Sequence, residues 1–173
     1  MYAGILLLNC KNFGAFIIMC SFLHISVLRA AFTGNLELIK VYGEIFMSLL
    51  KKQSSKVFNH LTKCDYPIET YVFEAASSMF VNNFPLDVAE KLWDIIMENP
   101  ELMMMRVGIA VFKALEKSII DKTKDEIIMM VKRPLEVITE KDLFKVIAKT
   151  TIGQKDYDNT KEKILNKSHL HIS

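Results

Sequence analysis

His60 and Cys64 are the pair of side chains in this sequence with the most reactive chemistry. They are four positions apart, so on a helix they share one face, as two metal ligands or a thiolate–imidazole pair would. A protein metal site takes three or four ligands, and the sequence offers no further ligand beside this pair. His169 and His171 lie in a polar tail, where we expect solvated side chains. We therefore expect no metal centre and no cofactor.

Acidic and methionine-rich stretches are the next candidates. Glu90 and Asp94 sit at helical spacing with lysines nearby, which predicts a solvated helix face that carries ion pairs. Methionines cluster at 103–105 and 129–130, a composition that also occurs in adaptable binding grooves. Methionine at helical spacing usually fills a core, and we expect that role here.

The common catalytic motifs are absent. The sequence contains no G-x-x-x-x-G-K-[ST], G-x-G-x-x-G, G-x-S-x-G or H-E-x-x-H pattern, and it has only six glycines with which to build a phosphate-binding loop. The residues therefore indicate no self-contained active site. We assign no catalytic, cofactor-binding or metal-binding residue from the sequence.

Composition limits the class of protein. With 173 residues and 51% apolar side chains, the chain can bury one sizeable core. Its 22 basic and 20 acidic residues give a net charge of +2, without the basic patch that a nucleic-acid partner requires. Three widely spaced cysteines fit free thiols in a reducing compartment.

The apolar stretch 13–28 could be mistaken for a membrane span. It is shorter than the roughly 20 residues a span needs, it contains serines and His24, and Arg29 ends it. A basic segment and a cleavage site, which would mark a signal peptide, are also lacking. We expect a buried core helix and no integral span, with a membrane-associated protein as the alternative.

Apolar residues recur at three and four positions along almost the whole chain, which predicts an all-α fold of about nine helices. Asn35, the T-K-D-E sequence at 123–126 and Thr139 are predicted to cap helices. The apolar helix after Pro100 is predicted to be central. The expected helices cover about 12–29, 35–52, 57–61, 67–80, 85–98, 101–120, 124–132 and 140–149, with one frayed helix after Gly153. Residues 1–150 then form the folded domain and 151–173 a polar, Lys-rich tail, with an α-solenoid as the alternative architecture.

Three stretches carry a family pattern. In "VFEAASSMFVNNFPLDVAEKLWDIIMEN" an aromatic-rich helix leads to a second helix with Pro and Trp-Asp at fixed spacing, and the matching residues are Phe80, Pro85, Leu86, Trp93 and Asp94. This stretch resembles TBC domains, the Rab GTPase-activating family. The next helix is similar to the family's Phe-Arg-Val-Ala-Leu-Ala-Leu-Leu-Lys sequence at Arg106, Val107, Ala110 and Lys113, and "FNHL" at His60 resembles its His-Leu pair. The resemblance covers residues 13–150 and implies a multi-helix orthogonal array.

The sequence departs from the family at two places. Ala75 and Ala76 stand where the family commonly has Trp-Phe, and Asn99 and Pro100 where it commonly has Glu-Gly. The start of the chain, "YAGILLL", resembles the segment that directly follows the family's Tyr-x-Gln motif. The resemblance therefore implies a carboxyl-terminal lobe alone.

The family acts by inserting an arginine and a glutamine into the Rab active site, from Ile-x-x-Asp-x-x-Arg and Tyr-x-Gln motifs. Arg29, Arg106 and Arg133 match neither pattern. The resemblance thus implies a fragment, a truncated gene model or a degenerate relative of a Rab GTPase activator that is inactive alone. Two alternatives stay open, namely a non-catalytic Rab-binding adaptor and an unrelated α-helical scaffold or membrane-associated protein.

Partner and location follow from the same resemblance. We expect a Rab-type small GTPase as partner and a cytoplasmic location, peripheral on endomembranes. A surface that normally packs against the other lobe would be exposed, so we also expect self-association, with 13–28 as the contact.

Overall fold

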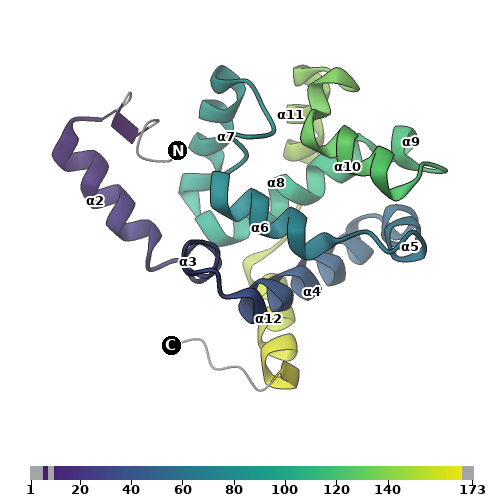
Figure 1. The fold of residues 1–173 in the computed structure, drawn as a ribbon, viewed down its shortest axis with the longest axis horizontal. Helices are drawn as coiled ribbons and strands as arrows, with labels where there is room; N and C mark the ends of the chain where they lie inside the picture. The colour runs from purple at the N-terminus through teal and green to yellow at the C-terminus, as the bar shows by residue number, and fades with distance from the viewer. Residues whose placement is uncertain (1–5, 8–9, 169–173) are drawn as a thin grey trace.

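The computed structural model describes residues 6–7 and 10–168 (Figure 1). These residues form α-helices and one 3₁₀ turn, with no strand among them, which confirms the predicted all-α class. The helices are α2 Asn12–Phe22, α3 Ser26–Thr33, α4 Leu36–Gln53, α5 Ser55–Lys63, α6 Ile68–Ser78, α7 Leu86–Glu98, α8 Pro100–Ala114, α9 Glu116–Ile119, α10 Lys124–Lys132, α11 Glu140–Lys149 and α12 Gln154–Ser168, with η1 at Pro134–Glu136.

Helix starts are where capping residues predict them. The Asn35 side chain accepts a hydrogen bond of 3.0 Å from the Leu38 amide at the start of α4. Thr123 and Glu126 form a reciprocal capping box on α10. Thr139 accepts from the amide of Asp142 at 3.1 Å and begins α11. Each cap satisfies an amide that has no partner inside its helix.

Helix α8 lies at the centre of the array, as predicted. It packs against α4, α6, α7 and α11, and most of its side chains are buried. Gly108 allows α8 to pack closely against α4, because a Cβ at this position would lie 2.9 Å from Cε2 of Phe46. Met104 and Met105 fill this core, whereas Met129 on α10 is 67% exposed. The core role predicted for the methionines therefore holds on α8 and is wrong for Met129.

Two predicted helices are each divided, which explains why the described residues form eleven helices where about nine were expected. The stretch 12–29 breaks after Phe22 and the two halves meet at 93°. The turn follows from packing, because α3 buries Val27, Leu28 and Ala30 and packs against α4 and α6. The stretch 101–120 likewise ends at Ala114, and the short α9 follows.

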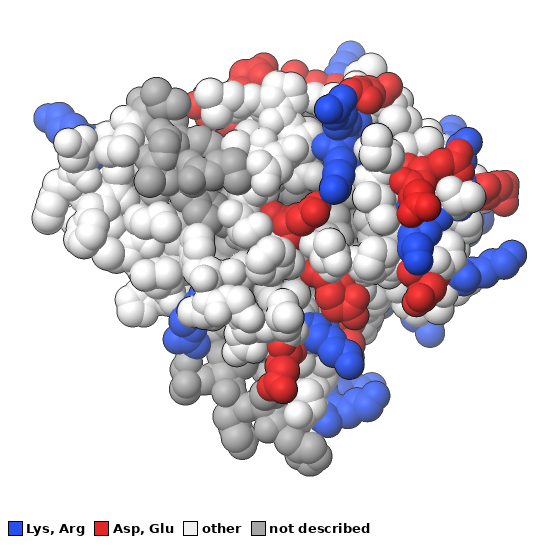
Figure 2. Space-filling model, viewed as in Figure 1, with Lys and Arg blue, Asp and Glu red and all other residues white. Residues whose placement is uncertain are grey.

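Helix α2 corrects the expectation of a buried helix at 13–28. Only Ala15 and Phe22 of α2 are buried, while Phe13 and Phe16 are 76% and 65% exposed. Figure 2 shows charged side chains gathered away from α2, whose side of this face is mostly uncharged. The predicted burial is therefore correct for α3 only.

Within the described residues, the helices individually fall short of the length and apolarity needed to cross a membrane. By length and composition alone, the bent pair α2 and α3 together meets that test.

Residues 154–168, which belong to the predicted polar tail, form the helix α12. Helix α12 packs along α4 and buries Tyr157 and Thr160. Lys52 on α4 forms an ion pair of 2.7 Å with Asp156 on α12. A few inward-facing residues thus hold this mostly polar segment against α4. His169 and His171 lie outside the described residues.

Candidate functional site

Trp93 is an internal anchor of α7. Its indole Nε1 donates a hydrogen bond of 2.9 Å to the carbonyl oxygen of Met79, where the chain leaves α6 in a left-handed conformation. Its ring meets Phe22 edge-on, with centroids 6.1 Å apart. Because only 6% of Trp93 is exposed, the residue ties α7 to the ends of α6 and α2, and its interpretation as a core residue is confirmed.

Arg106 holds the end of another helix. Its Nη2 donates to the carbonyl oxygen of Ile147 at 3.1 Å and to that of Ala148 at 3.5 Å. The last carbonyls of a helix lack partners within it, and a cation there also interacts favourably with the helix dipole. Arg106 therefore fastens α11 to α8. Its Nε is buried and has no hydrogen-bond partner among the described residues.

Lys113 and His60 also make hydrogen bonds between elements. Lys113 donates to the Gln53 side chain at 3.2 Å, and Gln53 donates to the Thr151 carbonyl at 2.8 Å. Burial lowers the pKa of the Lys113 ammonium. Nε2 of His60 lies 3.0 Å from the carbonyl oxygen of Lys122, so this nitrogen is the donor.

Cys64 does not join His60 in a reactive pair. Its thiol donates to the carbonyl oxygen of Leu61 at 3.5 Å. Among the described residues, no group of three or more His, Cys, Asp or Glu side chains is arranged to hold a metal ion.

The other two arginines also lie away from a common site. Arg133 is exposed and pairs with Glu136 three residues on, at 3.2 Å. Arg29 is half-buried on α3, where its charge acts on the Tyr42 hydroxyl. The structure thus places the three arginines on α8, at the end of α10 and on α3, and does not bring them together.

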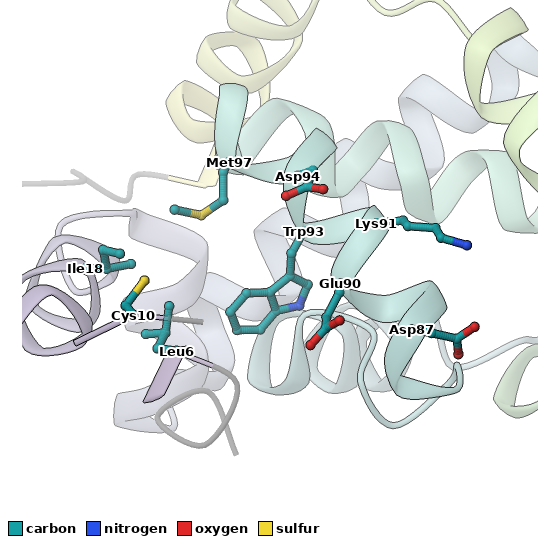
Figure 3. A pocket seen from close by; sticks show the side chains of 9 residues that line it. All are labelled: Leu6, Cys10, Ile18, Asp87, Glu90, Lys91, Trp93, Asp94 and Met97. Atoms are coloured by element: carbon teal, nitrogen blue, oxygen red, sulfur yellow. The ribbon is translucent and has the colours of Figure 1, made fainter. Parts of the chain in front are cut away.

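Side chains of the N-terminal segment and α7 line a groove of about 490 Å³, the α2–α7 groove (Figure 3). Leu6, Cys10 and Ile18 face Trp93 and Met97 of α7 across an apolar floor. Asp87, Glu90, Asp94 and Lys91 complete the lining.

One lysine of α7 has an ion-pair partner on another helix. Lys91 points away from the groove (Figure 3) and pairs with Glu140 on α11 at 2.7 Å. Hydrogen bonding to Glu140 and its charge raise the pKa of Lys91. Sequence reasoning missed this pairing because the partner lies 49 residues away. The three carboxylates at 87, 90 and 94 recur at helical spacing, which was the available indication of an acidic rim.

Glu101 is the centre of a second polar arrangement, the Glu101 cluster. Its Oε1 accepts from the hydroxyl of Tyr42 at 2.5 Å, the hydroxyl of Tyr157 at 2.9 Å and the ammonium of Lys161 at 2.5 Å. Burial, and then the Glu101 charge, raise the pKa of both tyrosines. Both phenols are therefore neutral donors, and the cluster joins α4, α8 and α12. It was missed because its members are far apart in sequence.

Neither arrangement holds the parts of a self-contained catalyst. The α2–α7 groove combines an apolar floor with carboxylates, which suits binding rather than group transfer. The Glu101 cluster directs three donors from two helices at one carboxylate oxygen, which suits a structural role.

Comparison with known proteins gives the family. Residues 1–120 match the family model of the Rab-GTPase-TBC domain. Drainin from Dictyostelium discoideum is 24% identical over 162 residues, 93% of this chain and 37% of that protein. TBC1 domain family member 12 from Rattus norvegicus is 24% identical over 146 residues, 84% of this chain and 21% of that protein.

TBC1 domain family member 14 from Homo sapiens is 25% identical over 114 residues, which are 66% of this chain and 16% of that protein. The chain therefore spans between 16% and 37% of the length of these relatives. The family match extends over more than half of the sequence and includes the helices that carry Trp93 and Arg106. The chain belongs to the Rab-GTPase-TBC domain family.

Proposed function

We propose that these residues form the carboxyl-terminal lobe of a GTPase-activating domain for Rab-type small GTPases, and that the 173-residue chain alone does not accelerate GTP hydrolysis. One observation carries the proposal: the family match over residues 1–120 coincides with a sequence that contains neither Ile-x-x-Asp-x-x-Arg nor Tyr-x-Gln. An arginine finger stabilises the charge of the transition state, and a glutamine orients the attacking water. Without both, a bound Rab keeps its intrinsic rate.

The contacts of the arginines support this proposal. Arg106 is the family-matched arginine, and its guanidinium is engaged by the carbonyl oxygens of α11. Arg133 pairs with its own neighbour Glu136. Redirecting Arg106 toward a nucleotide would leave the end of α11 without its donor. The family also motivates a cytoplasmic location at the surface of endomembranes, where Rab GTPases would meet the chain.

The test is single-turnover hydrolysis of GTP bound to a panel of Rab proteins, with the chain in excess and a finger-bearing TBC protein as positive control. We expect rates within about twofold of the intrinsic rate, because an arginine finger contributes about 10³–10⁵ in rate. Acceleration of a hundredfold or more would contradict the proposal. Circular dichroism of the same preparation verifies that the chain is folded.

A binding measurement on the same proteins separates the remaining alternatives. Binding of a Rab in its GTP form without acceleration would support either a lobe that retains part of the interface or a non-catalytic adaptor. Failure to bind any Rab, with the chain folded, would count against a Rab-directed function for these residues.

A further inference from the structure

Helices α4, α5 and α12 enclose a second groove, of about 810 Å³, the α4–α12 groove. Its apolar lining consists of Met47, Phe58 and Ile164, all partly buried. Its charged lining consists of four lysines and two acids, namely Lys51, Lys52, Lys163, Lys167, Glu44 and Asp156. An apolar floor with a rim of predominantly positive charge is therefore present on the side of α4 that faces α12.

The lysines of this rim are not equivalent. The ammonium of Lys52 already has partners within the chain, because it pairs with Asp156 at 2.7 Å and donates to Thr160 at 3.2 Å. Lys51 lies over the Phe58 ring, 5.3 Å from its centroid. Lys163 and Lys167 are exposed, one helical turn apart on α12, and form no ion pair with the described residues. Two adjacent cations thus remain for an external anion.

The shape and the lining together identify the kind of occupant. A flat anionic membrane would contact only the projecting ammonium groups, whereas the recessed floor offers Met47, Phe58 and Ile164 to inserted apolar side chains. A helix that carries leucines on one face would cover the apolar floor, and acids beside the leucines would pair with the projecting ammonium groups. Acids four residues apart on that helix have the spacing of Lys163 and Lys167.

We propose that the α4–α12 groove binds an acidic, amphipathic helical segment of a partner protein. The groove depends on α12, Gln154–Ser168, which lies beyond the family-matched residues 1–120. The proposal is therefore independent of GTPase activation, and either one can fail without the other.

The probe is a fluorescein-labelled peptide of about five helical turns, with leucines at i, i+3, i+4 and i+7 and glutamates flanking them. Fluorescence anisotropy against the full chain measures its Kd. A scrambled peptide of identical composition and a version with lysines in place of the glutamates are measured in parallel. We expect saturable binding of the acidic amphipathic peptide alone, weakened by salt.

Two matched variants locate the binding site. Lys163→Glu with Lys167→Glu reverses two exposed cations of the groove rim, and Lys145→Glu with Lys149→Glu makes the same change, at the same spacing, on α11. Both pairs are exposed, and each ends in the last turn of its helix. We expect the α12 variant to raise the peptide Kd about tenfold and the α11 variant to leave it unchanged. Ile164→Ser, which removes part of the floor, should also weaken binding.

Several results would overturn the proposal. They are the absence of saturable binding, equal affinity for the scrambled peptide, and equal loss of affinity in the α11 and α12 variants. Binding of the chain to vesicles of phosphatidylserine and phosphatidylcholine is measured for comparison with peptide binding. If these vesicles bind through Lys163 and Lys167 while the peptide does not, the groove region serves an anionic membrane and the peptide proposal is wrong.

Discussion

Trp93 and Met79 are joined by a hydrogen bond of 2.9 Å from the indole Nε1 to the backbone carbonyl oxygen. Met79 is itself in the left-handed region, at φ 45°, and ends α6. A side chain from α7 thus satisfies the last turn of the preceding helix at a point where the backbone is strained. Trp93 therefore stabilises the junction of α6 and α7, and it also lines the α2–α7 groove.

Trp93→Phe keeps an aromatic ring in the core and removes the donor to Met79. We expect a loss of about 1–3 kcal/mol in the free energy of unfolding, because a buried carbonyl is left without its partner. Trp93→Ala, which also leaves a cavity, should cost about 3–5 kcal/mol. Urea unfolding followed by circular dichroism gives both values. A Phe variant as stable as the parent would show that the hydrogen bond is unimportant.

Arg106→Met removes the guanidinium donor to Ile147 and Ala148 and keeps much of the apolar stem. We expect unfolding to become easier by about 1–3 kcal/mol, since the end of α11 loses a charged donor. Arg133→Met is the control, because its exposed pair with Glu136 should contribute less than about 1 kcal/mol. Equal effects in the two variants, measured by urea unfolding, would contradict this role for Arg106.

Sequence periodicity predicted the fold class and most helix starts because those properties are local. Asn35, Thr123 and Thr139 cap the helices they precede, and α8 is central because it is apolar around most of its circumference. Periodicity did not predict the break after Phe22, because that turn depends on where α3 finds a surface to pack against.

The polar contacts were less accessible to sequence reasoning. Glu101 gathers donors from residues 42, 157 and 161, and Lys91 pairs with Glu140, so each arrangement joins positions about 50 residues or more apart. A single sequence carries no record of such long-range pairs. The family motifs indicated the identity of the helices, while the structure showed what Trp93 and Arg106 contact.

Alkaline pH should destabilise the protein through its buried tyrosines. Burial raises the pKa of Tyr42, Tyr71 and Tyr157 above the ordinary value of about 10, and the Glu101 charge adds to this for two of them. Above pH 10 the unfolded chain releases phenol protons that the folded chain retains, so the unfolding free energy falls as pH rises.

Urea unfolding between about pH 9 and 11.5 measures this slope, which is about 1.4 kcal/mol per pH unit for each tyrosine that stays protonated. Tyr71→Phe should reduce the slope by the contribution of one tyrosine, about 1.4 kcal/mol per pH unit. A slope that is the same in parent and variant would show that Tyr71 ionises freely in the folded state.

Tyr157→Phe should loosen α12 without unfolding the rest. The variant removes the hydrogen bond of 2.9 Å to Glu101, while Tyr42 and Lys161 still hold the carboxylate. We expect the backbone amides of α12 to exchange with deuterium about tenfold faster, which corresponds to about 1.4 kcal/mol. Tyr66→Phe is the control and should leave exchange in α12 unchanged. Faster exchange throughout the molecule would show that α12 is part of the global core.

The exposed face of α2 should drive self-association of the chain. Phe13, Phe16 and Ile17 occupy positions i, i+3 and i+4 and are 76%, 65% and 47% exposed, so they form one contiguous apolar face. Covering such a face with a second copy removes apolar area from water at about 25 cal/mol per Å².

Replacing Phe13, Phe16 and Ile17 together by Ser should lower the average mass measured by light scattering across a concentration series. Met129→Ser is the matched control, because Met129 is 67% exposed but stands alone on α10. A reducing agent is kept in every sample, since the exposed Cys20 on α2 could otherwise link two copies through a disulfide. A parent chain that stays monomeric at high concentration would show that this face does not associate with itself, and equal effects of the α2 and Met129 variants would place the contact elsewhere.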